Sequence, residues 1–317
     1  MFSLALISVF STYVTQAIVD TIVFHFKISE QSASLAFTVA SLGYSFALFF
    51  YSTLAKRIGF KNVLVLSIFL LSITAVVLSF IKEYPTFLSL RFFQGVFSAG
   101  IPAIGIAYIH TVFKRPQQVH GIFVSGLLSG ALFSRVFGGI ITHYFGISVL
   151  FSFIGLFSFV VGIFAYVLLK NDPPNGILEN PFKIFSELKN FKIFYACLAS
   201  FCFFGSFISI YNCISFFLVN TFSLNDAQIG LLFLFGFTGP ITSFFSGTIF
   251  NQSTPLNWVF FCYAAANIAL VFFSISTIYS VIAGLMLFNA AIFSIHAIMS
   301  SFTAYMAWEK SSATSLL

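Results

Sequence analysis

Two long apolar runs meet at a basic turn that reads Ser52-Thr53-Leu54-Ala55-Lys56-Arg57-Ile58-Gly59-Phe60-Lys61-Asn62-Val63-Leu64. Its three cations lie within six residues, with Gly59 between them. Apolar runs of about 20 residues are long enough to cross a bilayer, and short loops rich in Lys and Arg stay on the cytoplasmic side. The stretch therefore predicts a hairpin of two spanning helices, 35–55 running inward and 62–81 running outward.

The composition indicates that the lipid bilayer is the solvent of this chain. Of 317 residues, 59% are hydrophobic and 7% are charged, whereas soluble domains carry about 25% charged residues. We therefore predict an all-α, polytopic integral membrane protein. The net charge of +6 resides in the loops, so we expect no nucleic-acid partner. The four cysteines lack zinc spacing, and we predict no metal site and no cofactor.

Ten membrane spans are expected from the apolar runs. They cover 3–25, 35–55, 62–81, 86–110, 120–142, 146–169, 193–219, 227–250, 257–275 and 278–304. Loops on the side of the basic turn hold ten cations, and the opposite loops hold only Lys27 and Lys82. This asymmetry predicts that both termini are cytoplasmic and that the protein is multi-pass in a plasma membrane, the inner membrane in a bacterium.

The chain is predicted to contain two related bundles. Residues 1–169 form a six-helix bundle, 170–192 a polar, proline-rich cytoplasmic linker, and 193–317 a bundle of four helices. A shift of 194 positions superimposes the helix ends of the two parts, which indicates a duplication. Because the fifth and sixth spans would map beyond residue 317, the second bundle has four of an expected six helices. The chain is either a fragment or a natural ten-helix protein.

The basic turn resembles the G-x-L-x-D-R-x-G-R-K-x-x-L signature of the major facilitator superfamily. Five positions match: Leu54, Arg57, Gly59, Lys61 and Leu64. Three depart, with Ser52, Lys56 and Phe60 in place of glycine, aspartate and arginine. The resemblance implies that Arg57, Gly59 and Lys61 belong to a gating turn.

The fourth predicted span contains Arg91-Phe92-Phe93-Gln94-Gly95, which is similar to the R-x-x-Q-G signature of the same family. Helical spacing places Arg91, Gln94 and Ser98 on one face. An arginine at this depth needs a partner, and Asp20 lies at a similar depth in the first span. We hypothesise that the two form an ion pair and that protonation of Asp20 couples protons to transport. The alternative is a structural ion pair with no part in the cycle.

The fifth predicted span carries Gly126-x3-Gly130-x3-Ser134-Arg135-x2-Gly138-Gly139, which resembles the glycine-rich signature of efflux-type members. Small residues at every fourth position let helices approach closely. Tyr13 and Gln16 lie in a stretch similar to one in arabinose-efflux-permease-like and related drug-efflux members. Arg135 together with Arg91 would favour an anionic substrate group, although Arg135 could equally extend toward lipid headgroups.

The second half offers polar residues at cavity positions but no sharp motif. The candidates are Tyr211, Asn212, Asn289 and His296. Asn289 and His296 are seven positions apart and therefore share a helix face. The alternative for each is a hydrogen bond between helices.

The resemblance implies secondary active transport of a small molecule by alternating access, with protons as the coupling ion and efflux favoured over uptake. The alternative is a truncated or decayed member that does not transport or that needs a partner chain. The sequence has neither an ATP-binding G-x4-G-K-[ST] motif nor an H-E-x-x-H pair, so we expect neither a primary pump nor an enzyme. The substrate and the oligomeric state stay open.

Overall fold

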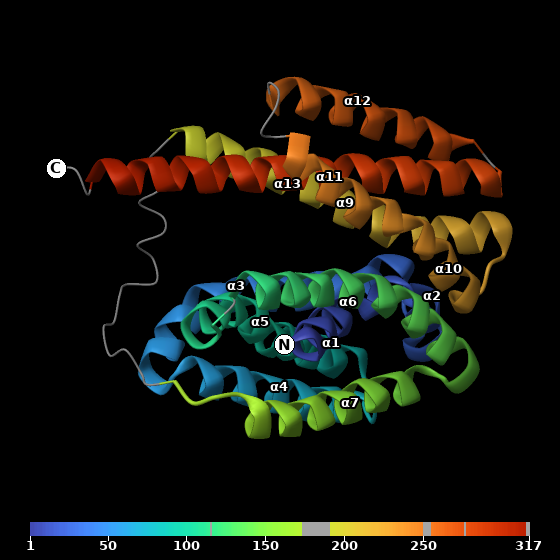
Figure 1. Cartoon of the computed structure of the whole chain (residues 1–317). Helices are drawn as coiled ribbons and strands as arrows, with labels where there is room; N and C mark the ends of the chain where they lie inside the picture. Colours follow the sequence, from blue (N-terminus) through green and yellow to red (C-terminus); the bar gives the residue numbers. More distant parts are fainter. Residues whose placement is uncertain (115, 173–190, 250–254, 276, 315–317) are drawn as a thin grey trace. The chain divides into compact units, whose positions relative to one another are not determined.

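The computed structural model describes residues 1–114, 116–172, 191–249, 255–275 and 277–314, and these residues fold into helices and short connections without a strand (Figure 1). Their contacts divide the chain into two compact units. The first comprises Met1–Phe182 together with Ser215–Leu231, and the second Lys183–Ile214 together with Leu232–Leu317. The all-helical fold predicted from the sequence is confirmed.

The first unit is a bundle of long helices. Its elements are α1 (Phe2–Tyr13), the 3-10 turn η1 (Val14–Gln16), α2 (Val19–Phe26), α3 (Glu30–Ile58), α4 (Phe60–Leu78), α5 (Tyr84–Val112), α6 (Pro116–Phe145) and α7 (Ile147–Leu168). The main pairings are α3 on α5, α1 on α6, and α4 on both α5 and α7. The end of α9 (Phe191–Phe222) and most of α10 (Asp226–Leu232) also belong to this unit.

Glycines set the closest helix approaches in the first unit. A methyl group at Gly126 would lie 2.5 Å from the carbonyl oxygen of Phe2, which is closer than a carbon atom can approach. Gly130 faces the backbone of Leu6 in the same way. The glycine spacing of α6 therefore serves a close helix approach, as the sequence predicted, and the structure identifies α1 as the partner helix.

The second unit has the helices α9 (Phe191–Phe222), α11 (Thr238–Ile249), α12 (Pro255–Ser274) and α13 (Ile278–Thr314), with the 3-10 segment η3 (Phe233–Phe237) before α11. α11 and α12 both pack on α13. α3 and α4 pack on α5 in the same arrangement, and α5 and α13 begin 194 positions apart, at residues 84 and 278. The duplication predicted from the sequence therefore appears in the helix pairing.

Two predicted spans depart from a regular α-helix in the structure. The span 3–25 breaks at η1, where α1–η1 and α2 meet at a bend of 64°. The span 227–250 consists of α10, η3 and α11. Among the described residues, eight helices are long and apolar enough to cross a membrane, or nine if the bent pair counts as one span. Most of the predicted linker, 173–190, lies outside the described residues.

Large apolar side chains cover the outer surface of these helices. On α7, for example, Leu156, Phe164 and Val167 are 65%, 60% and 68% exposed. In water this surface would be unfavourable, whereas hydrocarbon tails solvate it. The apolar exterior agrees with a chain whose helices lie in lipid.

Candidate functional site

The break in the first span is the structural origin of the candidate site. α1 ends at Tyr13, and the chain passes through η1 before α2 begins at Val19. A helix end leaves its last carbonyl groups without intrahelical partners. In lipid such groups need other donors, since no water is available to them. The residues around this break show how the first unit meets that need.

Arg91 of α5 supplies most of these donors. Its guanidinium donates to the carbonyl oxygens of Ser11 (2.8 Å) and Thr12 (2.9 Å), which lie in the last turn of α1. It also donates to the carbonyl of Ala36 (3.2 Å), to the hydroxyl of Thr15 (3.2 Å) and to the side-chain oxygen of Gln94. Five hydrogen bonds match the five N–H donors of a guanidinium. A cation at a helix C-terminus also interacts favourably with the helix dipole.

The predicted ion pair between Asp20 and Arg91 is therefore wrong. All five groups that bind Arg91 are neutral oxygens, and its side chain is fully buried. The charged neighbours of Asp20 are Glu30 and Asp226 instead. Depth alone led to the pairing, because the sequence does not show that the first span breaks between Tyr13 and Val19 and leaves carbonyl acceptors for Arg91.

Hydroxyl groups extend this polar interface between α1 and α5. Ser8 donates to the carbonyl oxygen of Ser98 at 2.9 Å, and the hydroxyls of Thr12 and Ser98 lie 2.9 Å apart. Gln94 is also fully buried, and its amide nitrogen has no hydrogen-bond partner among the described residues. A buried amide donor without a partner is costly, so an acceptor placed beside the Gln94 amide would stabilise it.

Arg135 of α6 meets the same break from another side. Its guanidinium donates to the side-chain oxygen of Gln16, at 2.7 Å from Nη2 and 3.2 Å from Nε, and to the carbonyl oxygen of Ala131 at 2.7 Å. It also lies 5.1 Å from the ring centre of Tyr13, within cation–π range. The structure thus brings Arg135 together with Tyr13 and Gln16, which the sequence singled out in a different span.

The second unit brings together two of its four candidates. The hydroxyl of Tyr211 donates to the side-chain oxygen of Asn289 at 2.9 Å, and the Asn289 amide donates to the carbonyl of Leu285 at 2.7 Å. Tyr211 and Asn289 are both buried. His296 is exposed and packs its ring against Phe204, with 4.5 Å between ring centres, and Asn212 is half-buried.

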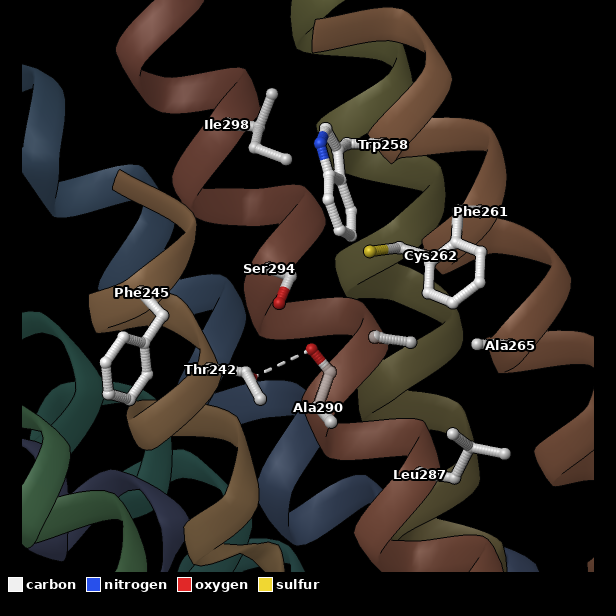
Figure 2. A pocket seen from close by; sticks show the side chains of 11 residues that line it. Thr242, Phe245, Trp258, Phe261, Cys262, Ala265, Leu287, Ala290, Ser294 and Ile298 are labelled. Carbon is white, nitrogen blue, oxygen red and sulfur yellow. Dashed lines mark hydrogen bonds between the residues drawn. The ribbon is translucent and has the colours of Figure 1, made fainter. Parts of the chain in front are cut away.

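A cavity of about 230 Å³ lies between α11, α12 and α13 of the second unit (Figure 2). Its lining is largely apolar, with Phe245, Trp258 and Cys262 among the residues that border it. The hydroxyl of Thr242 is already bound to the carbonyl oxygen of Ala290, at 3.0 Å (Figure 2). The lining is suited to an apolar group and offers little to fix the orientation of a polar ligand.

The basic turn is held by a residue that sequence reasoning missed. Gly59 has φ +88, a conformation that favours glycine. The carboxylate of Asp172 accepts from the backbone N–H groups of Phe60 (2.5 Å) and Lys61 (2.8 Å), which begin α4. Lys61 donates to Asn171 at 2.9 Å, and Arg57 is exposed. Asp172 caps a helix from 111 positions away, so no local pattern could reveal it.

Thr15 and Asp226 are the other residues that the sequence reasoning did not select. Thr15 binds Arg91, and Asp226 binds Thr21. The chain has only eight Asp and Glu residues, and this scarcity of acidic residues was the signal that could have drawn attention to Asp226. Among the described residues, no three His, Cys, Asp or Glu side chains are grouped closely enough to hold a metal ion.

An apolar helical bundle with a broken span and polar groups gathered at the break has the build of a multi-pass membrane transporter. The whole chain, residues 1–317, matches the family model described as Major Facilitator Superfamily. The chain belongs to this superfamily. Membership indicates secondary transport of a small molecule across a lipid bilayer.

Three similar proteins support this assignment. An uncharacterized transporter of Buchnera aphidicola from Schizaphis graminum is 28% identical over 96% of this chain and 76% of its own length. A bacterial homologue of the human lysosomal transporter Spinster, in an inward-facing and occupied conformation, has a TM-score of 0.76 at 14% identity and covers 94% of this chain and 71% of its own. A D-xylose–proton symporter has a TM-score of 0.66 at 13% identity, and the match covers 96% of this chain and 85% of the symporter.

Proposed function

We propose that the protein couples transport to protons, works by alternating access and exports its substrate. The observation that carries the proposal is the broken first span, where Arg91 and Arg135 converge on η1 and its flanks. Discontinuous helices form the binding sites of many secondary transporters. The D-xylose–proton symporter supports protons as the coupling ion, and the efflux-type glycine pattern of α6 supports export.

The substrate class that fits this site is a small molecule with an anionic group. Arg91 binds only neutral oxygens, so none of its hydrogen-bonded partners neutralises its charge. A buried cation without a counter-ion favours the binding of an anion. In the first unit we expect the substrate to approach the polar side chains of Tyr13, Gln16, Gln94, Ser98 and Arg135. For the second unit by itself, the cavity candidates stay Tyr211, Asn212, Asn289 and His296.

Everted membrane vesicles test this proposal with a mixture of candidate substrates. Vesicles from cells that overproduce the chain are energised so that their interior becomes acidic, and they are incubated with an isotopically labelled cell extract. Proton-coupled export predicts that mass spectrometry finds a small anionic compound concentrated inside. A protonophore should abolish the accumulation, and vesicles without the protein should show none.

Two variants show whether the proposed site is responsible. Gln16→Ala removes the acceptor of Arg135 and should lower the accumulation rate about tenfold, the effect of ~1.4 kcal/mol. Ser206→Ala is the matched control, since Ser206 is exposed on α9 and donates only within its own helix. Equal rates in the two variants, or accumulation that survives the protonophore, would contradict the proposal.

A further inference from the structure

A segment of the chain is docked on the first unit although the residues on both sides of it belong to the second. This docked hairpin comprises Ser215–Leu231. Ser215 donates to the carbonyl oxygen of Gln16 at 2.8 Å, and Asn220 donates to Glu30 at 3.3 Å. Near its end, Asp226 accepts a hydrogen bond from the hydroxyl of Thr21. These three contacts attach the hairpin to the region of the broken span.

Asp226 is an unusual residue for this position. Its side chain is only 6% exposed, and one of its carboxylate oxygens, Oδ1, has no hydrogen-bond partner among the described residues. The other oxygen accepts from Thr21 alone. An ionised carboxylate in such surroundings would be poorly solvated, whereas a protonated carboxyl would not carry that cost.

The charged groups around Asp226 do not neutralise it. Asp20 on α2 carries a charge of the same sign as the Asp226 carboxylate, and Glu30 on α3 repels Asp20 in the same way. Among the charged groups of the described residues, His143 on α6 favours the carboxylate, and it is exposed. Arg135, also on α6, donates to Gln16 and Ala131. The surroundings thus favour the protonated carboxyl on balance.

Helix capping does not account for Asp226. The side chain of Asn225 accepts from the backbone N–H of Gln228 at 2.9 Å, and Gln228 reciprocates to the N–H of Asn225 at 3.0 Å. This reciprocal pair is a capping box, and it satisfies two of the backbone groups at the start of α10. Asp226 lies in the first turn, where the helix dipole favours a carboxylate. Its Oδ2 nevertheless accepts from Thr21 of α2, and its Oδ1 has no hydrogen-bond partner among the described residues.

Close packing of α10 on α6 buries Asp226. A methyl group at Gly230 would lie 2.6 Å from the carbonyl oxygen of Arg135, and Gly139 of α6 faces the backbone of Asp226 itself. Glycines at both positions let α10 lie directly against α6. The carboxylate of Asp226 is only 6% exposed in this packing, so its full exposure to water requires the hairpin to move away.

We propose that Asp226 is a proton-binding site that controls the docked hairpin. The protonated carboxyl stays buried beside Thr21, and loss of the proton releases the hairpin from α2 and α6. The charge asymmetry of the loops places this site on the face opposite the basic turn, so the proton would come from outside the cell. That this proton takes part in the transport cycle rests on the proposed function.

The direction of the pH dependence follows from the burial of this residue. Burial is the main cause that raises the pKa of Asp226 to about 6, Asp20 raises the pKa further, and Thr21 and His143 oppose the rise. In a released hairpin the pKa would return to about 3.9. A pKa that is higher in the docked state means that docking is strongest below about pH 4. Docking then weakens about tenfold per pH unit up to about pH 6 and is constant above about pH 7.

Hydrogen–deuterium exchange of the full chain in lipid nanodiscs measures this docking directly. Exchange of the amides of 226–231 is followed between pH 4.5 and 7.5, corrected for intrinsic rates and referred to α7. The proposal predicts that their protection falls about tenfold or more as the pH rises over this range. Asp226→Asn, which cannot ionise, should keep high protection at every pH. Asp172→Asn, a matched loss of a carboxylate elsewhere, should retain the wild-type pH dependence of 226–231.

Two further variants test the charged neighbours and do not alter Asp226. Asp20→Asn removes a like charge and should move the midpoint to lower pH, and His143→Gln should move it to higher pH. If Asp226→Asn does not fold, these shifts carry the test. Protection that does not change with pH, or the same dependence in Asp226→Asn, would overturn the proposal. Because exchange needs no substrate, a chain that shows this dependence but moves no compound would refute the proposed function alone.

Discussion

At the scale of single residues, Arg91 shows how one side chain stabilises a broken membrane span. Its five hydrogen bonds reach α1, η1, α3 and α5. The planar guanidinium is suited to this because it presents five donors in a fixed arrangement, whereas a lysine has three donors on a single nitrogen. The charge of Arg91 is therefore less important for its structural role than the number and geometry of its donors.

Arg91→Lys should consequently destabilise the protein even though it keeps the charge. We expect a loss of about 2–3 kcal/mol, since at least two buried carbonyl or side-chain oxygens lose a charged donor. Thermal unfolding in detergent measures the effect as a lower midpoint. Arg57→Lys, at an exposed position, is the control, and equal midpoints for the two variants would contradict this account of Arg91.

Asp172 is the second residue with a structural role that can be tested. Asp172→Asn removes a charge and one of the two oxygens that accept from Phe60 and Lys61. The expected loss is about 1 kcal/mol, the usual contribution of a helix N-cap with a favourable charge. Faster hydrogen exchange at the start of α4 would show it. Asn171→Ala, which removes only the exposed contact with Lys61, should change exchange there little, and an equal effect of both variants would refute a capping role.

At the scale of elements, the sequence predicted the helices well, whereas two local departures from regular α-helix were not predicted. Long apolar runs bounded by charged or polar loops leave little choice of structure, because a helix satisfies all its backbone groups in lipid. The break at η1 carries no such signal, because it contains neither glycine nor proline and its compensating hydrogen bonds come from Arg91, far away in the sequence. The segment η3 does carry one: it contains Gly236, and Pro240 has no N–H to donate to the carbonyl of Gly236. The break at η1 depends on tertiary contacts, and Gln16 and Arg135 could be singled out as polar residues but not paired.

The docking of α10 on α6 gives a test at this scale. Gly230→Ala should destabilise the protein by about 1–3 kcal/mol, because the added methyl group meets the backbone carbonyl of Arg135. Gly205→Ala on α9 is the matched control, since nothing lies within 4 Å of the added carbon. It should be neutral or stabilise by up to about 1 kcal/mol through helix propensity. The unfolding midpoints of both variants measure the effect. A wild-type midpoint for Gly230→Ala would mean that the close approach of α10 to α6 is not needed for stability.

At the scale of the whole molecule, membership of the Major Facilitator Superfamily agrees with the resemblance noted in the basic turn, α5 and α6. The helix pairings of α3, α4 and α5 recur in α11, α12 and α13, as a duplicated chain requires. The sequence could not predict which distant helices its few charged side chains contact. Asp172 and Asp226 act on helices distant in the chain, and only folding brings them there.

Counterflow in proteoliposomes tests the central claim, that this chain is a carrier, most directly. Liposomes that contain the purified chain are loaded with an unlabelled cell extract and diluted into the same extract in labelled form, without any ion gradient. A carrier that alternates between two states exchanges its substrate, so at least one labelled small molecule should transiently exceed its equilibrium level inside. Uptake of every compound without such an overshoot, or uptake equal to that in protein-free liposomes, would contradict secondary transport by this chain.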